Sequence, residues 1–111
     1  MSRKKIFIDG EAGTTGLLIR DRLSERKEFN IVSLEPHFRK DISAKRDAIN
    51  QADVAILCLP EDASRQTVSL IENENTRVID TSIAFRTDGN WVYGFPELTS
   101  GHRNKIKDAD R

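Results

Sequence analysis

Three glycines and two threonines stand close together near the start of the chain, in the segment Gly10-Glu11-Ala12-Gly13-Thr14-Thr15-Gly16. Glycine lets the backbone adopt angles that side chains forbid and lets it approach a ligand closely. A helix that begins here would offer unpaired N–H groups and a partial positive charge, which suit a pyrophosphate. We therefore expect this segment to bind the diphosphate of a dinucleotide. The residues assigned to that contact are Gly10, Gly13, Thr14, Thr15 and Gly16.

The spacing of these glycines departs at Ala12 from the Gly-x-Gly-x-x-Gly pattern of dinucleotide-binding turns. The alternative is a tight strand-to-helix turn that needs glycine and binds nothing. The flanking residues favour the dinucleotide interpretation. Residues 6–8 form a short apolar run typical of a strand, and Leu18, Ile19 and Leu23 then follow at helical spacing.

The residues after the second expected strand, 31–34, indicate which dinucleotide is bound. An acid there would hold the ribose hydroxyls of NAD, whereas Arg or Lys would pair with the 2′-phosphate of NADP. Glu35 is present, and so is the pair Arg39-Lys40, with Ser33 nearby as a donor. Two adjacent cations match a dianion better than they match two hydroxyls, so we expect NADP(H) on Ser33, Arg39 and Lys40. The alternative is that the two cations form an ordinary solvated loop.

These residues must be positioned by alternating strands and helices. Residues 54–59 are apolar throughout, as in a strand that is covered on both faces of a parallel sheet, and 77–80 form another short strand. Helical segments lie between the strands. The alternation predicts an α/β fold of the Rossmann-like, doubly wound type, a mainly parallel sheet with helices on both faces.

Two further segments are less regular. Alanines at every fourth residue over 44–52 predict a short helix with a small-residue face, which Ser43 could cap. Later in the chain, 91–93 are a possible strand and Pro96-Glu97 a possible start for a last helix.

In doubly wound sheets the ligand lies outside the carboxyl ends of the strands, where the strand order reverses. Leu59, Pro60 and Ser82 follow two of the expected strands, so we expect them along the ribose and nicotinamide half of the cofactor. Asp80 stands at the same edge. A structural role, in which its carboxylate bonds to a turn, explains this acid at least as well as a role in the site does.

No catalytic set is recognisable among these residues. Cys58 lies inside an apolar strand, where free cysteine is commonly a small buried residue and not a nucleophile. His37 and His102 have no neighbouring pattern that pairs them with a nucleophile or a metal ion, so we expect both at the surface and no metal site.

Composition narrows the class of protein. A chain of 111 residues suits one domain. Lys+Arg and Asp+Glu each number 18, which gives no electrostatic reason to expect nucleic acid or a membrane as partner. One cysteine excludes an internal disulfide and fits a reducing compartment. The N-terminal apolar run is too short for a signal peptide, so we expect a cytoplasmic protein.

Several segments in order resemble one family, the N-acetyl-gamma-glutamyl-phosphate reductases, in the shorter of its two sequence types and over its N-terminal part. The glycine loop alone would also suit an aspartate-semialdehyde dehydrogenase, and the Tyr-Gly-Phe-Pro-Glu-Leu run makes the resemblance more specific. The segments are 8–16, 52–60, 78–82 with Phe85-Arg86, and 91–98.

The resemblance implies an NADPH-dependent reduction of N-acetyl-glutamyl 5-phosphate to the 5-semialdehyde, in arginine biosynthesis. A cysteine thiolate would attack the acyl phosphate, phosphate would leave, and hydride would reduce the thioester, with a histidine as acid and base. Arg86 would meet the anionic substrate. The alternative for Arg86 is a salt bridge at the surface or between domains.

The resemblance also implies that the catalytic residues of the family are not among these 111 residues. Members of the family continue, just after the position of Arg111, into an Asn-Pro-Gly-Cys-Tyr segment that holds the nucleophile, and the histidine belongs to a later substrate domain. We therefore expect residues 1–111 to be an NAD(P)-binding Rossmann domain, a fragment that is inactive alone. Its parent would be a homo-oligomer that takes a small acyl-phosphate substrate through the absent domain. Two alternatives stay open: a stand-alone NADP-binding or redox-sensing module, and an aspartate-semialdehyde dehydrogenase-like fragment.

Overall fold

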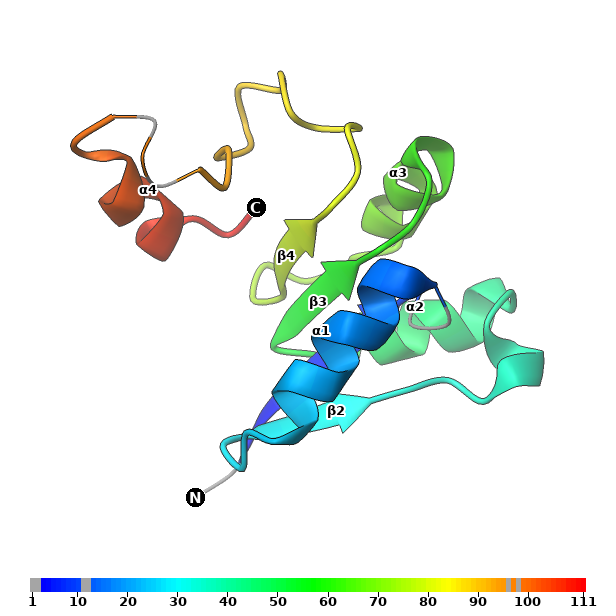
Figure 1. Cartoon of the computed structure of the whole chain (residues 1–111). Coiled ribbons are helices and arrows are strands. Elements are labelled where there is room, and N and C mark those ends of the chain that lie inside the picture. The colour runs from blue at the N-terminus through cyan, green and yellow to red at the C-terminus, as the bar shows by residue number, and fades with distance from the viewer. Residues whose placement is uncertain (1–2, 11–12, 96, 98) are drawn as a thin grey trace.

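One parallel sheet forms the centre of the molecule (Figure 1). The structure is a computed structural model that describes residues 3–10, 13–95, 97 and 99–111. Its strand order within these residues is β2-β1-β3-β4. The strands are β1 (Lys4–Asp9), β2 (Phe29–Val32), β3 (Val54–Leu57) and β4 (Arg77–Asp80). The helices are α1 (Thr14–Ser24), α2 (Ile42–Gln51), α3 (Glu61–Ser69) and α4 (His102–Asp108), with a short 3-10 turn η1 (Pro36–Phe38).

The strand order reverses in the middle of the sheet. β1 pairs with β2 on one side, where Ile6 lies opposite Ile31, and with β3 on the other, where Ile8 lies opposite Ile56. The chain runs from β1 outward to β2 and then crosses back over β1 to β3. The carboxyl ends of β1 and β3 therefore form the reversal point at which parallel sheets of this kind bind ligands.

Helices cover both faces of the sheet, which confirms the predicted fold class. Alternate strand residues face opposite sides. Phe7 and Leu57 pack with α2 and the segment after α3, and Ile6 and Ile56 pack under α1. Figure 1 shows α1 in front of the sheet and α4 beyond β4. The larger of the two core clusters consists of Phe7, Ile49, Ala52, Ala55, Leu57, Leu70 and Val78.

Three local expectations are wrong. β2 covers Phe29–Val32 and not 31–34, because Phe29 packs under α1 while Ser33 is already exposed. Leu18 is 57 % exposed, since α1 turns Ile19 and Leu23 towards the sheet instead. The cap of α2 is Asp41, whose carboxylate accepts the amide of Ala44, and not Ser43.

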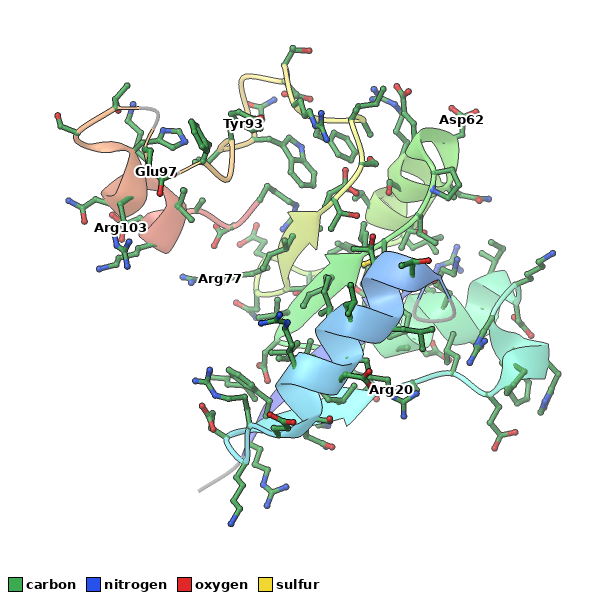
Figure 2. All side chains as sticks on the ribbon, viewed as in Figure 1. Arg20, Asp62, Arg77, Tyr93, Glu97 and Arg103 are labelled. Carbon is green, nitrogen blue, oxygen red and sulfur yellow. The ribbon has the colours of Figure 1, made fainter. Side chains whose placement is uncertain are left out.

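The C-terminal segment lies beside β4. The amide of Val78 donates to the carbonyl of Asp110 at 2.8 Å, and the guanidinium of Arg111 donates to the carbonyl of Thr76 at 2.7 Å. Figure 2 shows Arg77 on β4, whose Nε lies 3.6 Å from a carboxylate oxygen of Asp110. The last residues of the chain therefore pair with part of the outer edge of the sheet.

The segment between β4 and α4 also differs from its prediction. Residues 91–93 are not a strand. The last helix begins at His102 and not at Pro96-Glu97; Glu97 lies ahead of it, and Pro96 falls outside the described residues. His102 is buried rather than at the surface, because its Nε2 contacts the carbonyl of Tyr93. None of the helices described is long and apolar enough to cross a membrane.

Candidate functional site

Gly10 makes the turn at the carboxyl end of β1. Its φ is +85°, a conformation that side chains rarely adopt. A Cβ at this position would lie 2.4 Å from the carbonyl oxygen of Cys58, which follows β3. The amide of Gly13 then donates to the carbonyl of Gly10 at 3.1 Å and closes the turn. Both the backbone angle and the close approach to β3 therefore require glycine at this place.

The turn leads directly into the N-terminus of α1. Gly13 is the N-cap residue and has no side chain with which to cap the helix, and the first turn carries no acid. Thr14 and Thr15 are exposed, while Gly16 is buried. The first N–H groups of a helix have no partner within it, so this end can accept an anion from outside. The arrangement fits the diphosphate contact predicted from the sequence, apart from Glu11 and Ala12, which lie outside the described residues.

Leu59 joins the glycine turn from the neighbouring strand. Its Cδ2 lies 3.3 Å from the place where a Cβ of Gly10 would stand. Pro60 is exposed and forms the N-cap of α3. The residues after β1 and β3 therefore meet at one edge, as the predicted parallel sheet requires.

Arg39 approaches the glycine turn from the other side. Together with Leu34 and Gly10 it lines a narrow cavity of about 10 Å³ at the end of β1. Arg39 is half-buried, whereas Ser33 and Lys40 are exposed. Of the three residues expected at a 2′-phosphate, the structure thus brings one against the glycine turn.

Glu35, the acid that would favour NAD, is exposed and faces another residue. One of its carboxylate oxygens lies 3.5 Å from Nε2 of His37, which is also exposed, as predicted. Pro36 begins the 3-10 turn directly after it.

An ion pair beneath the glycine turn was not predicted. Asp9 is the last residue of β1, and one of its carboxylate oxygens lies 3.0 Å from Nζ of Lys45 on α2. The hydroxyl of Thr67 on α3 lies 3.4 Å from the same oxygen. The available signal was an acid that ends an apolar strand immediately before Gly10, although its partner is distant in sequence.

A second cavity, of about 250 Å³, lies at the carboxyl end of β4, and Ser82 and Arg86 both line it. The hydroxyl of Ser82 donates to one oxygen of Asp80 at 2.6 Å, and that of Ser64 donates to the other at 2.8 Å. Asp80 therefore bonds to the turn that follows its own strand and anchors that turn to α3. These contacts match the structural role considered for Asp80 in the sequence analysis.

Aromatic contacts hold the wall of this cavity against α3. The rings of Phe85 and Trp91 stack with centroids 4.0 Å apart, and the guanidinium of Arg65 lies 5.2 Å from the Phe85 ring. Tyr93 belongs to the same wall (Figure 2). Arg86 is exposed, and no ion pair joins its guanidinium to a described residue. It can therefore meet an anion from solvent.

Cys58 is a half-buried free cysteine directly after β3, at the reversal point. Burial raises the pKa of its thiol, and the hydrogen bond with Thr81 opposes this only in part. A protonated thiol reacts slowly, because the thiolate is the nucleophile. Among the residues that the structure describes, no group of three or more His, Cys, Asp or Glu side chains could hold a metal ion.

The chain is similar to known proteins over nearly all its length. Residues 24–109 match the family described as "Semialdehyde dehydrogenase, NAD binding domain". An N-acetyl-gamma-glutamyl-phosphate reductase of Trichormus variabilis is 52 % identical over 109 residues, 98 % of this chain and 34 % of that protein. One of Chelativorans sp. is 53 % identical over 107 residues, 96 % of this chain and 34 % of that protein.

The similarity confirms the resemblance that the motifs indicated. The chain spans about a third of the length of the curated relatives it matches.

Proposed function

The chain belongs to the semialdehyde dehydrogenase NAD-binding domain family, and from this we propose that it is the NADP(H)-binding part of an acyl-phosphate reductase. One observation carries the proposal. Gly10, whose positive φ and close approach to the carbonyl of Cys58 exclude a side chain, leads to a helix whose N-cap residue Gly13 has no side chain, at the point where the strand order reverses. That combination is what a diphosphate needs from a protein backbone.

We assign the diphosphate to the glycine turn and to the hydroxyls of Thr14 and Thr15, which are exposed beside it. Arg39, with Lys40 and Ser33 on the loop after β2, is proposed to hold the 2′-phosphate. Its support is the position of Arg39 beside Gly10. Glu35, which would favour NAD, faces His37 instead.

The other half of the cofactor would lie along Leu59, Pro60 and Ser82. Leu59 contacts the glycine turn, and Ser82 lines the cavity at the end of β4. The bound cofactor would supply a hydride. Arg86, in the same cavity as Ser82, would bind an anionic group of the substrate.

The substrate we propose is N-acetyl-glutamyl 5-phosphate, reduced to the semialdehyde in arginine biosynthesis. The names of the relatives support it over an aspartyl phosphate. The thiol of Cys58 does not suit nucleophilic attack. We therefore place the nucleophilic cysteine and the acid/base histidine of the reductase in sequence beyond these 111 residues, with residues 1–111 as its NAD(P)-binding domain.

A pair of titrations tests the cofactor assignment. The unaltered chain should bind NADPH more tightly than NADH in calorimetry. Arg39→Met should weaken NADPH binding about tenfold or more, because a charged hydrogen bond is lost, and leave NADH binding unchanged.

Arg103→Met serves as the matched control, since Arg103 lies on α4 beyond β4 (Figure 2). It should change neither affinity. Tighter binding of NADH than of NADPH by the unaltered chain would contradict the assignment of Arg39.

A further inference from the structure

A buried ion pair stands directly beneath the glycine turn. The side chains of Asp9 and Lys45 are only 9 % and 11 % exposed, and their charged atoms lie 3.0 Å apart. Asp9 is followed immediately by Gly10, and its own carbonyl accepts the amide of Cys58 at 2.9 Å. The pair therefore lies where β1, β3 and α2 meet, at the base of the site.

Stability alone does not account for such a pair. Two charges lose their hydration on burial, and replacing a buried ion pair by apolar residues is often neutral or stabilising. The surroundings would suit an apolar pair, since Phe7 on the same face of β1 and Ile49 one turn after Lys45 both belong to the main core cluster. Stability therefore gives no reason for the pair, and its two charges also act on any anion bound at the glycine turn.

With Asp9 present, its charge must be balanced for an anion to bind nearby. A lone carboxylate at Asp9 would stand one residue from the backbone that receives a diphosphate, and would repel it. At an effective dielectric constant of about 20, two unit charges within roughly 12 Å of each other change an equilibrium constant about tenfold or more. Lys45 cancels the charge of Asp9 and removes that repulsion.

We propose that Lys45 is a positioning residue for dinucleotide binding, which acts by neutralising Asp9 beneath the glycine turn. The inference rests on the proposed function, because it takes the glycine turn as the diphosphate site. It is distinct from the assignment of Arg39, which concerns the 2′-phosphate. Since the diphosphate is common to both cofactors, Lys45 should affect NADPH and NADH to the same degree.

A purely structural clamp makes a different prediction. If the pair only holds α2 to β1, removing either partner should loosen the turn and weaken binding alike. If the charge of Asp9 controls cofactor affinity, removing Lys45 and removing Asp9 change that affinity in opposite directions. Lys45→Met removes the cation paired with Asp9 and leaves the carboxylate with the Thr67 hydroxyl, whereas Asp9→Asn removes the carboxylate and leaves the Lys45 cation to attract the diphosphate.

The experiment compares Lys45→Met, Asp9→Asn, the double variant and Lys45→Arg by calorimetric titration with NADPH and with NADH, alongside thermal unfolding. Both single variants should melt at lower temperature. Lys45→Met should bind both cofactors about tenfold more weakly, and Asp9→Asn should bind them as tightly as the unaltered chain or more tightly. The double variant and Lys45→Arg should restore most of the affinity.

Arg77→Met is the control for loss of a positive charge away from the site. Arg77 lies on β4, and its exposed side chain pairs with Asp110. It should leave both affinities unchanged. If Lys45→Met does not fold, Asp9→Asn decides alone, since the clamp requires it to weaken binding. Equal weakening by the two single variants would overturn the inference and leave the proposed function intact. Failure of the unaltered chain to bind either cofactor would overturn both.

Discussion

At the scale of single residues, the site depends most on Gly10. Its positive φ and its approach to the carbonyl of Cys58 are two separate reasons why a side chain does not fit. The glycine motif could be predicted from the sequence because it is local. The Asp9–Lys45 pair could not, because its partners are far apart in sequence and meet only once α2 docks beside β1.

Gly10→Ala should therefore lower the free energy of unfolding by more than about 2 kcal/mol, through backbone strain and the clash with Cys58. Urea unfolding measures it. Gly89→Ala is the matched control, since a Cβ there would meet nothing within 4 Å. If Gly10→Ala lowers the free energy of unfolding no more than Gly89→Ala does, the requirement for glycine at position 10 is contradicted.

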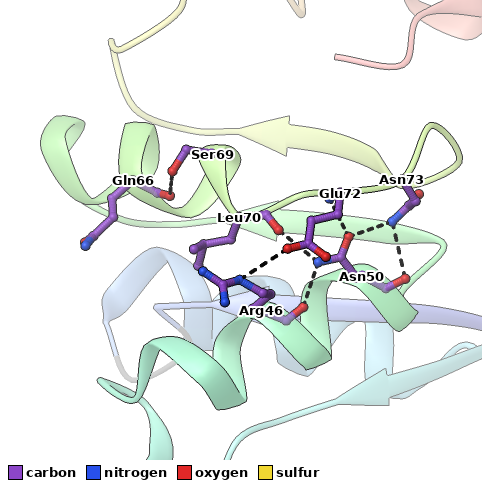
Figure 3. Close-up of polar contacts among 7 residues, drawn as sticks. All are labelled: Arg46, Asn50, Gln66, Ser69, Leu70, Glu72 and Asn73. Atoms are coloured by element: carbon purple, nitrogen blue, oxygen red, sulfur yellow. Dashed lines mark hydrogen bonds and ion pairs between the residues drawn. The ribbon is translucent and has the colours of Figure 1, made fainter.

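At the scale of elements, one side chain ties α2 to the loop before β4 (Figure 3). The amide nitrogen of Asn50 donates to the carbonyl of Leu70 at 2.9 Å. Its oxygen accepts the backbone amide of Glu72 at 2.7 Å and the side-chain amide of Asn73 at 2.9 Å. These contacts lie at the amino ends of the strands, opposite the glycine turn.

Asn50→Ala should cost about 2 to 3 kcal/mol of stability, because the removal leaves several polar groups without their partner. It should leave the affinity for NADPH unchanged. Denaturant unfolding and calorimetric titration, with the exposed Asn90→Ala as control, measure the two effects. A large change in affinity would show that the two ends of the sheet are coupled.

The elements differ in how far the sequence predicts them. β4 was predicted at its observed bounds, whereas β3 was predicted over 54–59, because those residues are apolar throughout, and ends at Leu57. β2 lies at the edge of the sheet and is only partly buried, so its weaker pattern misplaced it by two residues. The position of His102 depends on its contact with the loop at Tyr93, which no local pattern encodes.

At the scale of the whole molecule, the proposed cofactor site and the exposed Arg86 lie in this chain, while burial raises the pKa of the half-buried Cys58 thiol. Binding and chemistry are therefore separable in this chain. We propose that the described residues hold a dinucleotide, and the proposed reaction also needs a thiolate, which the raised pKa of Cys58 disfavours at this position.

The chain alone should accordingly show no reductase turnover with N-acetyl-glutamyl 5-phosphate and NADPH, even at concentrations at which it binds the cofactor. The absorbance of NADPH followed over time measures this. Oxidation of NADPH that depends on the acyl phosphate would contradict the proposed location of the nucleophile, and Cys58→Ser would show whether Cys58 is responsible.

The hydrogen bond from Val78 to Asp110 has one further effect. An open strand edge offers a template on which another copy of the chain can add itself and begin an aggregate. Here Asp110 and Arg111 lie beside the first part of β4. The ion pair of Arg77 with Asp110 and the hydrogen bond from Arg111 to Thr76 hold them there. These contacts therefore shorten the part of the β4 edge that is open to pairing with another copy of the chain.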